Sequence, residues 1–192
     1  MNRPTALFLV ALLASLLGAS AEVRATDEFV VDPMHSAVNF KVSHLALSWV
    51  QGRFNDISGG FMIDKDNAAK SSFHMTMKAE SIDSGNAKRD EHLRSPDFFN
   101  VKQYPVLSFK STSVKAIKDG YEVTGDFTLH GVTKPVTFNL VGGRAAEFPK
   151  GVTRTGYTTE LSIKRSDFGM DKFKEGVGDE VFIAVSFEGT KK

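Results

Sequence analysis

The sequence predicts an all-β fold in which about eight antiparallel strands close into a barrel. Apolar and polar residues alternate with a period of two in several separate runs, as in strands with one buried face. Short polar turns join most of these runs. The chain also has 16 Phe but only one Trp and three Tyr, which supplies much apolar volume with few polar tips. A two-sheet sandwich remains the competing architecture.

The N-terminal segment is predicted to be a signal peptide rather than part of the fold. Arg3 precedes an unbroken apolar run, 6–17, which is too short to cross a membrane. Ala19-Ser20-Ala21 then matches a small-x-small cleavage pattern, so we expect a signal peptide over 1–21. Cleavage after Ala25 and a retained N-terminal anchor are the alternatives. We therefore expect export across a membrane and no stable membrane insertion of the mature protein.

The remaining residues, 22–192, have the length of one domain with a substantial core. The sequence contains no cysteine, which excludes thiol redox chemistry, cysteine-ligated zinc and iron–sulfur clusters. With 24 Lys and Arg against 23 Asp and Glu, the net charge is +1. A nucleic-acid partner is not expected, because that function needs clustered basic charge.

The strands are placed by their alternation and by the turns between them. Turn signals lie at 64–67, 118–120 and 130–135, and Asp119-Gly120 is a strong hairpin signal. The runs with the clearest period of two are 37–44, 72–79, 121–129, 136–140 and 181–187. Each of these runs is predicted to be an antiparallel strand with one apolar and one polar face.

Two interruptions break the strand pattern. We expect one short helix around 86–95, because Asn86 can cap it, Asp90 suits its first turn and Pro96 ends it. A long polar, glycine-rich loop is predicted near 164–180, before the last strand. Long loops in a compact domain often cover a functional site.

Four motifs in this order resemble the YceI-like domain family. The first is Asp32-Pro33-x-His35-Ser36. The second combines charge, one histidine and two adjacent aromatics: Arg89-Asp90-x-His92-Leu93-x-Ser95-x-Asp97-Phe98-Phe99. The third runs from Gly125 to Val136, and the fourth is Arg165-x-Asp167-Phe168-Gly169-Met170. Together the matches cover nearly all of the mature chain.

The resemblance implies a lipocalin-like antiparallel β-barrel in the bacterial periplasm. It also implies an elongated apolar lumen that holds a polyisoprenoid or another long-chain amphiphile, such as an isoprenoid-type lipid or a quinone. The family brings no agreed catalytic reaction and no cofactor. The expected function is therefore that of a periplasmic binding or carrier protein, without catalysis.

Strand alternation nominates the residues that would line such a lumen. Phe40 and Val42 share one strand face, as do Met75 and Met77, whose flexible thioethers suit an adaptable wall. The predicted lumen residues are Phe40, Val42, Phe54, Met75, Met77, Phe98, Phe99, Phe109, Phe127, Phe138 and Ile183.

Four polar residues are candidates for contact with a ligand's head group. His44 falls on the same strand face as Phe40, so we expect it to point inward, either as a core histidine or as a head-group contact. Arg89, His92 and Arg94 share the short helix, and arginine suits bidentate phosphate contact. The alternative is structural: Arg89 or Asp90 pairs elsewhere and attaches the helix to the barrel.

No metal site or catalytic constellation is predicted. The five histidines lack the spacing of a zinc motif, and His74 falls on a polar strand face. The sequence has no GxSxG motif and no alternation of strands with helices. Two other functions stay open: an enzyme that acts on an isoprenoid lipid or quinone through inward histidines, and a ligand-free stress-response interaction module. A homodimer is compatible with the sequence.

Overall fold

The computed structural model describes residues 26–192. The predicted signal peptide, 1–21, and both cleavage sites lie outside the described residues. One α-helix, α1 (Ala87–Arg94), and three short 3-10 helices accompany the strands: η1 (Ala68–Lys70), η2 (Ala79–Ser81) and η3 (Arg165–Phe168). The strands are β1 (Thr26–His44), β2 (Ser48–Phe54), β3 (Ile57–Asp64), β4 (Ser72–Lys78), β5 (Ile82–Asp83), β6 (Val106–Ile117), β7 (Gly120–Leu129), β8 (Val132–Glu147), β9 (Thr153–Lys164) and β10 (Val177–Lys191).

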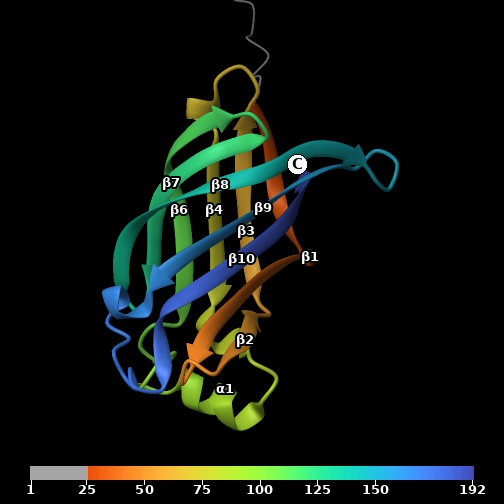
Figure 1. The fold of residues 1–192 in the computed structure, drawn as a ribbon. Coiled ribbons are helices and arrows are strands. Elements are labelled where there is room, and N and C mark those ends of the chain that lie inside the picture. Colours follow the sequence, from red (N-terminus) through yellow and green to blue (C-terminus); the bar gives the residue numbers. More distant parts are fainter. Residues whose placement is uncertain (1–25) are drawn as a thin grey trace, which may run out of the picture.

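Eight of these strands form a closed antiparallel ring, which confirms the predicted barrel over a sandwich. The order around the ring is β10-β9-β8-β7-β6-β4-β3-β1, and β1 also pairs with β10. The register places Phe29 opposite Lys191 and Phe40 opposite Ile183. The short strands β2 and β5 extend the sheet beside the C-terminal half of β1. Figure 1 shows the ring, with the tip of the β8–β9 hairpin projecting beyond it.

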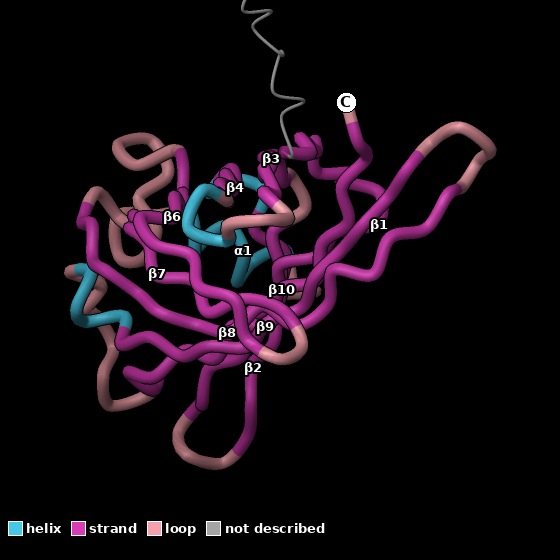
Figure 2. Tube along the Cα trace, turned by 90° about the horizontal axis from the view of Figure 1, so that it is seen from above, coloured by secondary structure: helices cyan, strands magenta, loops and turns pink. Residues whose placement is uncertain are grey.

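Helix α1 covers one end of the barrel, which we call the helix end. It lies below the strands in Figure 1 and within their outline in the end-on view of Figure 2. The Asn86 side chain caps the helix by accepting a hydrogen bond from the Arg89 amide (3.1 Å), and Ser95 ends it directly before Pro96. The helix predicted around 86–95 is thus confirmed, with the capping residue that the sequence indicated.

The loop predicted near 164–180 is shorter and more deeply packed than expected. The 3-10 helix η3 begins directly after β9, and β10 already starts at Val177. Gly169, at φ 73°, turns the chain out of η3. Arg165, Phe168 and Met170 are buried, so the first half of this segment packs against the barrel, whereas residues 171–175 are exposed.

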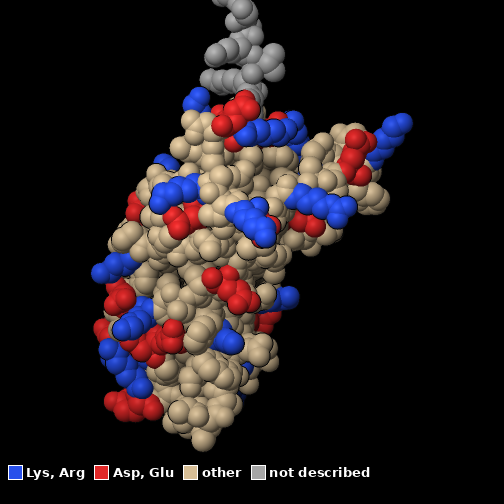
Figure 3. Space-filling model, turned by 45° about the horizontal axis from the view of Figure 1, so that its top comes forward, with Lys and Arg blue, Asp and Glu red and all other residues tan. Residues whose placement is uncertain are grey.

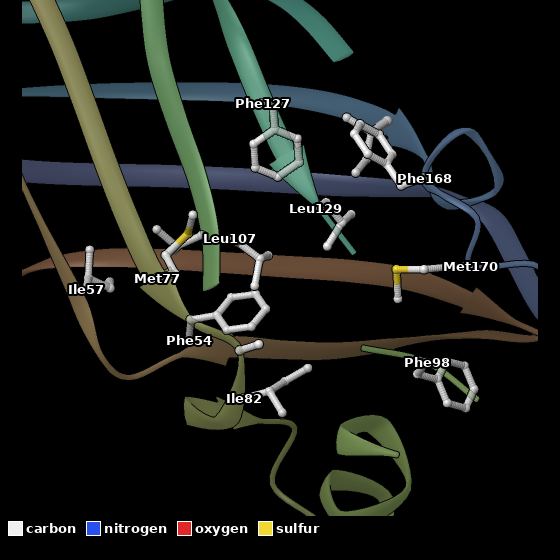
Figure 4. Packing of buried hydrophobic residues seen from close by; sticks show 13 residues of the cluster. Phe54, Ile57, Met77, Ile82, Phe98, Leu107, Phe127, Leu129, Phe168 and Met170 are labelled. Carbon is white, nitrogen blue, oxygen red and sulfur yellow. The ribbon is translucent and has the colours of Figure 1, made fainter. Parts of the chain in front are cut away.

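Two apolar clusters fill the two ends of the barrel. The helix-end cluster, part of which is drawn in Figure 4, gathers the ends of the strands next to α1 and the residues that pack beneath them. Its buried members include Phe54, Ile82, Phe98, Phe127, Phe168 and Met170. The far-end cluster lies at the opposite end and consists of Phe29, Val31, Phe61, Ile63, Phe73, Val114, Val123, Leu140, Tyr157 and Phe187.

The outer surface carries both signs of charge. On the face drawn in Figure 3, Lys and Arg are interspersed with Asp and Glu, and no broad area has a single sign. Within residues 26–192, no helix is long and apolar enough to cross a membrane.

Candidate functional site: an apolar cavity inside the barrel

A cavity lies inside the barrel and is lined by residues of both clusters. It has about 160 Å³ of space that the centre of a water molecule can occupy. Every strand of the ring contributes to its wall, and Leu93, Phe98 and Phe99 add to it from α1 and the residues that follow. Only His74, Thr159 and Arg165 among the lining residues have polar side chains. Such a site can hold an apolar chain by burial and offers very few groups for polar recognition.

All eleven residues nominated as lumen residues line this cavity. Alternation sends those on the ring strands inward, and closure of the ring brings their faces together. Phe54 comes from β2, and Phe98 and Phe99 come from the segment after α1. Their contact with a ligand remains a prediction. They are Phe40, Val42, Phe54, Met75, Met77, Phe98, Phe99, Phe109, Phe127, Phe138 and Ile183.

The far-end cluster limits how deep the cavity reaches. Phe61 stacks on Phe29 with ring centroids 4.8 Å apart and on Phe73 at 5.7 Å. Tyr157 and Phe187 meet the Phe61 ring edge-on, with centroids at 5.8 and 5.5 Å. Part of the phenylalanine content therefore fills the barrel rather than widening its interior. The burial of Tyr157 in this cluster also raises the pKa of its phenol above the ordinary value.

The charged side chains of α1 hold the helix against the strands. The buried Asp90 carboxylate accepts hydrogen bonds from Ser84, at 2.8 Å from the backbone nitrogen and 2.5 Å from Oγ. Arg89 donates to Ser84 through Nε and Nη2, both at 2.7 Å. Arg94 donates to the carbonyls of Glu80 (2.7 Å) and Ile82 (2.8 Å). The structural alternative is thus confirmed, and neither arginine lines the cavity.

His92 lies at the surface beside the cavity wall. Its Nε2 is 3.1 Å from the Asp97 carboxylate, and its ring meets Phe98 edge-on at 5.1 Å and Phe173 at 5.5 Å. Phe98 lines the cavity, whereas His92 is exposed and does not. A head-group contact by His92 therefore remains a prediction.

His44 ends β1 on the strand face predicted for it, but it does not reach the cavity wall. His44 is exposed at the end of β1 and does not line the cavity. The register of β1 with β2 is unbroken from Val38 to His44, and His44 pairs with the lining residue Val177, so it keeps the strand face of Phe40 and Val42. Neither His44 nor His92 lines the cavity, so these two histidines give the enzyme hypothesis no support.

Arg165 is a buried polar residue that the sequence analysis did not nominate. Only 3% of the residue is exposed. Its guanidinium donates to the carbonyls of Gly178 (2.9 Å), Met170 (2.5 Å) and Val177 (2.9 Å), and burial lowers its pKa. These bonds fix the η3 segment under the barrel. The neighbours of Arg165 in the sequence are polar, as in a solvated loop. The sequence therefore gave no sign that Arg165 is buried and bonded to carbonyls.

The polar groups of the described part of the chain do not converge on a metal site. Among residues 26–192, no group of three or more His, Cys, Asp or Glu side chains is arranged to hold a metal ion. His74, although it borders the cavity through its strand, is exposed, as its place on a polar strand face predicted.

A closed antiparallel barrel around an apolar cavity defines a binding-protein fold of the lipocalin-like kind. The family model of the YceI-like domain matches residues 29–189. The chain therefore belongs to the YceI-like domain family, as the four motifs indicated.

Known relatives agree with this assignment. Protein YceI of Escherichia coli O157:H7 is 40% identical over 182 residues, which cover 93% of this chain and 94% of that protein. The crystal structure of BcnA from Burkholderia cenocepacia is 28% identical, with a TM-score of 0.74 over 82% of this chain and 98% of that one. A structure described as a polyisoprenoid binding domain from Saccharophagus degradans shares the fold at 18% identity, with a TM-score of 0.65 over 85% of this chain and 98% of that one.

Proposed function

We propose that this protein is a periplasmic binding or carrier protein that holds a polyisoprenoid-type lipid, or another long-chain amphiphile, in the barrel lumen without catalysis. The observation that carries the proposal is the apolar cavity, walled by all eight strands of the ring. The description of the Saccharophagus degradans relative as polyisoprenoid binding supports the ligand class. The signal-peptide pattern of residues 1–21 supports the location.

The free energies of burial and of hydrogen bonding indicate that the ligand's tail sets its affinity. Burial of one methylene contributes about 0.8 kcal/mol, so a chain of about twenty carbons gains more than about 10 kcal/mol before ordering costs. A hydrogen bond to a head group adds only about 0.5–3 kcal/mol net. The tail should therefore determine how tightly the ligand binds, and its polar group should determine orientation.

The direct test is native mass spectrometry of the protein purified from its own periplasm, followed by solvent extraction of the bound molecule. We expect a mass increment that the extraction releases unchanged as a long-chain amphiphile. Recovery of ligand-free protein, together with no uptake of added isoprenoid lipid, would refute the proposal and favour the ligand-free interaction module. Recovery of a chemically altered lipid would favour an enzyme.

A matched pair of variants on β4 tests whether the lumen is the binding site. Met75 lines the cavity, whereas Thr76, its neighbour on the same strand, does not. Met75→Glu should abolish uptake of lipid, because it places a carboxylate in an apolar wall. Thr76→Glu should leave uptake unchanged. Equal loss in both variants, with both folded by circular dichroism, would place the ligand elsewhere.

A further inference from the structure

One hydroxyl in the cavity wall has no hydrogen-bond partner. Thr159 lies on β9, opposite Val185 of β10, and its residue is only 7% exposed. Between residues 26 and 192, two buried side-chain polar atoms lack a partner: Thr159 Oγ1 and His130 Nε2. Thr159 lines the cavity and His130 does not. Buried hydroxyls normally have partners, so this one indicates that something else supplies the bond.

The residues around Thr159 do not offer a hydrogen-bond partner to its Oγ1 atom. Tyr157, Leu161 and Ile163 follow the same inward face of β9, and Val185 lies opposite. The closest comparison is Thr155, which is equally buried but donates its hydroxyl hydrogen bond to the Arg144 carbonyl. Thr159 is therefore distinguished from its buried neighbour by its free hydroxyl and by its position on the cavity.

The surroundings of Thr159 favour a neutral group as its partner. Arg165 is the one charged side chain that is buried in the same wall. It lies six residues after Thr159, and six residues of extended strand span about 20 Å. Its Nε, Nη1 and Nη2 already donate to three carbonyls. A phosphate or carboxylate at Thr159 would be buried without a counter-charge, which is strongly unfavourable.

We infer that Thr159 Oγ1 is a polar subsite inside the lumen, which binds a small neutral hydrogen-bonding group of the ligand such as a hydroxyl or a carbonyl oxygen. This inference rests on the proposed function and adds the class of ligand and its orientation. The polar group of the ligand then lies among the apolar walls rather than at the α1 surface. A pure hydrocarbon that covered the hydroxyl would lose about five- to hundredfold in affinity, because the hydroxyl would stay unpaired.

The test compares two probes that differ by one oxygen: geranylgeraniol and the same chain with hydrogen in place of the hydroxyl. Dissociation constants are measured for both with the wild-type protein and with Thr159→Val, which keeps the shape and removes the hydroxyl. In the wild-type protein the hydrocarbon should have the larger dissociation constant. We expect the ratio of the hydrocarbon's dissociation constant to that of the alcohol to be about tenfold smaller in Thr159→Val than in the wild-type protein. Thr159→Ser, which restores the hydroxyl, should keep the wild-type ratio, as should Thr155→Val.

Each outcome is decisive. If wild-type protein binds neither probe, the proposed function fails. If it binds both and Thr159→Val leaves the ratio unchanged, or weakens both probes equally, the binding function stands and the inference is overturned. Geranylgeranyl phosphate should bind about tenfold or more weakly than the alcohol. Equal or tighter binding of the phosphate would refute a neutral subsite. Thermal unfolding of each variant verifies that it is folded.

Discussion

The Phe40 ring packs against Gly52, its partner on the neighbouring strand β2. The two residues are paired in register, and a Cβ on Gly52 would overlap the Cζ atom of the Phe40 ring. A similar contact joins β6 and β7, where Gly125 pairs with Ser111 and a Cβ on Gly125 would lie 2.5 Å from Cζ of Phe109. Both rings line the cavity. The glycines thus let large rings lie against the wall and leave the lumen open.

Gly52→Val is predicted to push the Phe40 ring into the lumen. We expect a loss of about 1–3 kcal/mol in unfolding free energy from overpacking. Affinity for a long-chain lipid should fall about tenfold, because the displaced ring takes the place of one or two methylenes of the ligand. Denaturant unfolding and lipid titration check the two effects. Gly176→Ala is the control, since its Cβ would make only an ordinary 3.8 Å contact with Leu45.

Asp90→Ala should loosen helix α1 from the barrel. The change leaves the Ser84 backbone amide and hydroxyl without their acceptor, at a cost of about 1–3 kcal/mol in unfolding free energy. Hydrogen exchange should rise across 87–101, the segment that also carries the lining residues Phe98 and Phe99. The exposed neighbour Glu91→Ala should change neither measurement. Unaltered exchange in Asp90→Ala would show that packing alone holds the helix.

Asp32 should make stability fall on acidification. Its carboxylate accepts hydrogen bonds from Arg154 (2.6 Å) and His35 (2.8 Å), which hold its pKa well below the ordinary 3.8. A lowered pKa in the folded state stabilises the protein above about pH 4, and this contribution is lost as the pH falls further. Asp32→Asn should therefore unfold with a weaker dependence on pH below about 4. Asp119→Asn, at an exposed turn, should keep the wild-type dependence.

Arg165→Lys should destabilise the protein although it keeps the charge. A lysine ammonium cannot reproduce the planar fork that reaches three carbonyls, so we expect a loss of about 2–4 kcal/mol in unfolding free energy. Arg53→Lys is the control, because that arginine is largely exposed and its ion pair with Asp83 is long, at 3.8 Å. Equal stability of the two variants would show that the three carbonyl contacts contribute little.

The barrel and its lining were predictable because both depend on local alternation. A period of two assigns an inner face to each strand, and a closed ring makes all inner faces converge, so Phe109 and Ile183 could be placed without knowing the pairing. Helix α1 was equally predictable, since Asn86 and Pro96 mark its two ends within the sequence.

The errors arose where tertiary contacts override the local pattern. The exposure of His44 follows from its place as the last residue of β1, and the alternation of β1 does not reveal where the strand ends. The role of Arg165 depends on carbonyl partners supplied by Met170 and by the start of β10. Thr159 could have been found by extending the alternation of Tyr157 along its strand, although a threonine suits either face and gave no reason to do so.

The pairing of β1 with β10 joins nearly opposite ends of the described chain, with Phe29 opposite Lys191. The ring therefore stays open along one seam until almost the last described residue is in place. Contacts of such long range close slowly, because most of the chain must be ordered before they form. Until then the interior remains exposed to water and to other chains, so assembly is most vulnerable to aggregation before β10 pairs with β1.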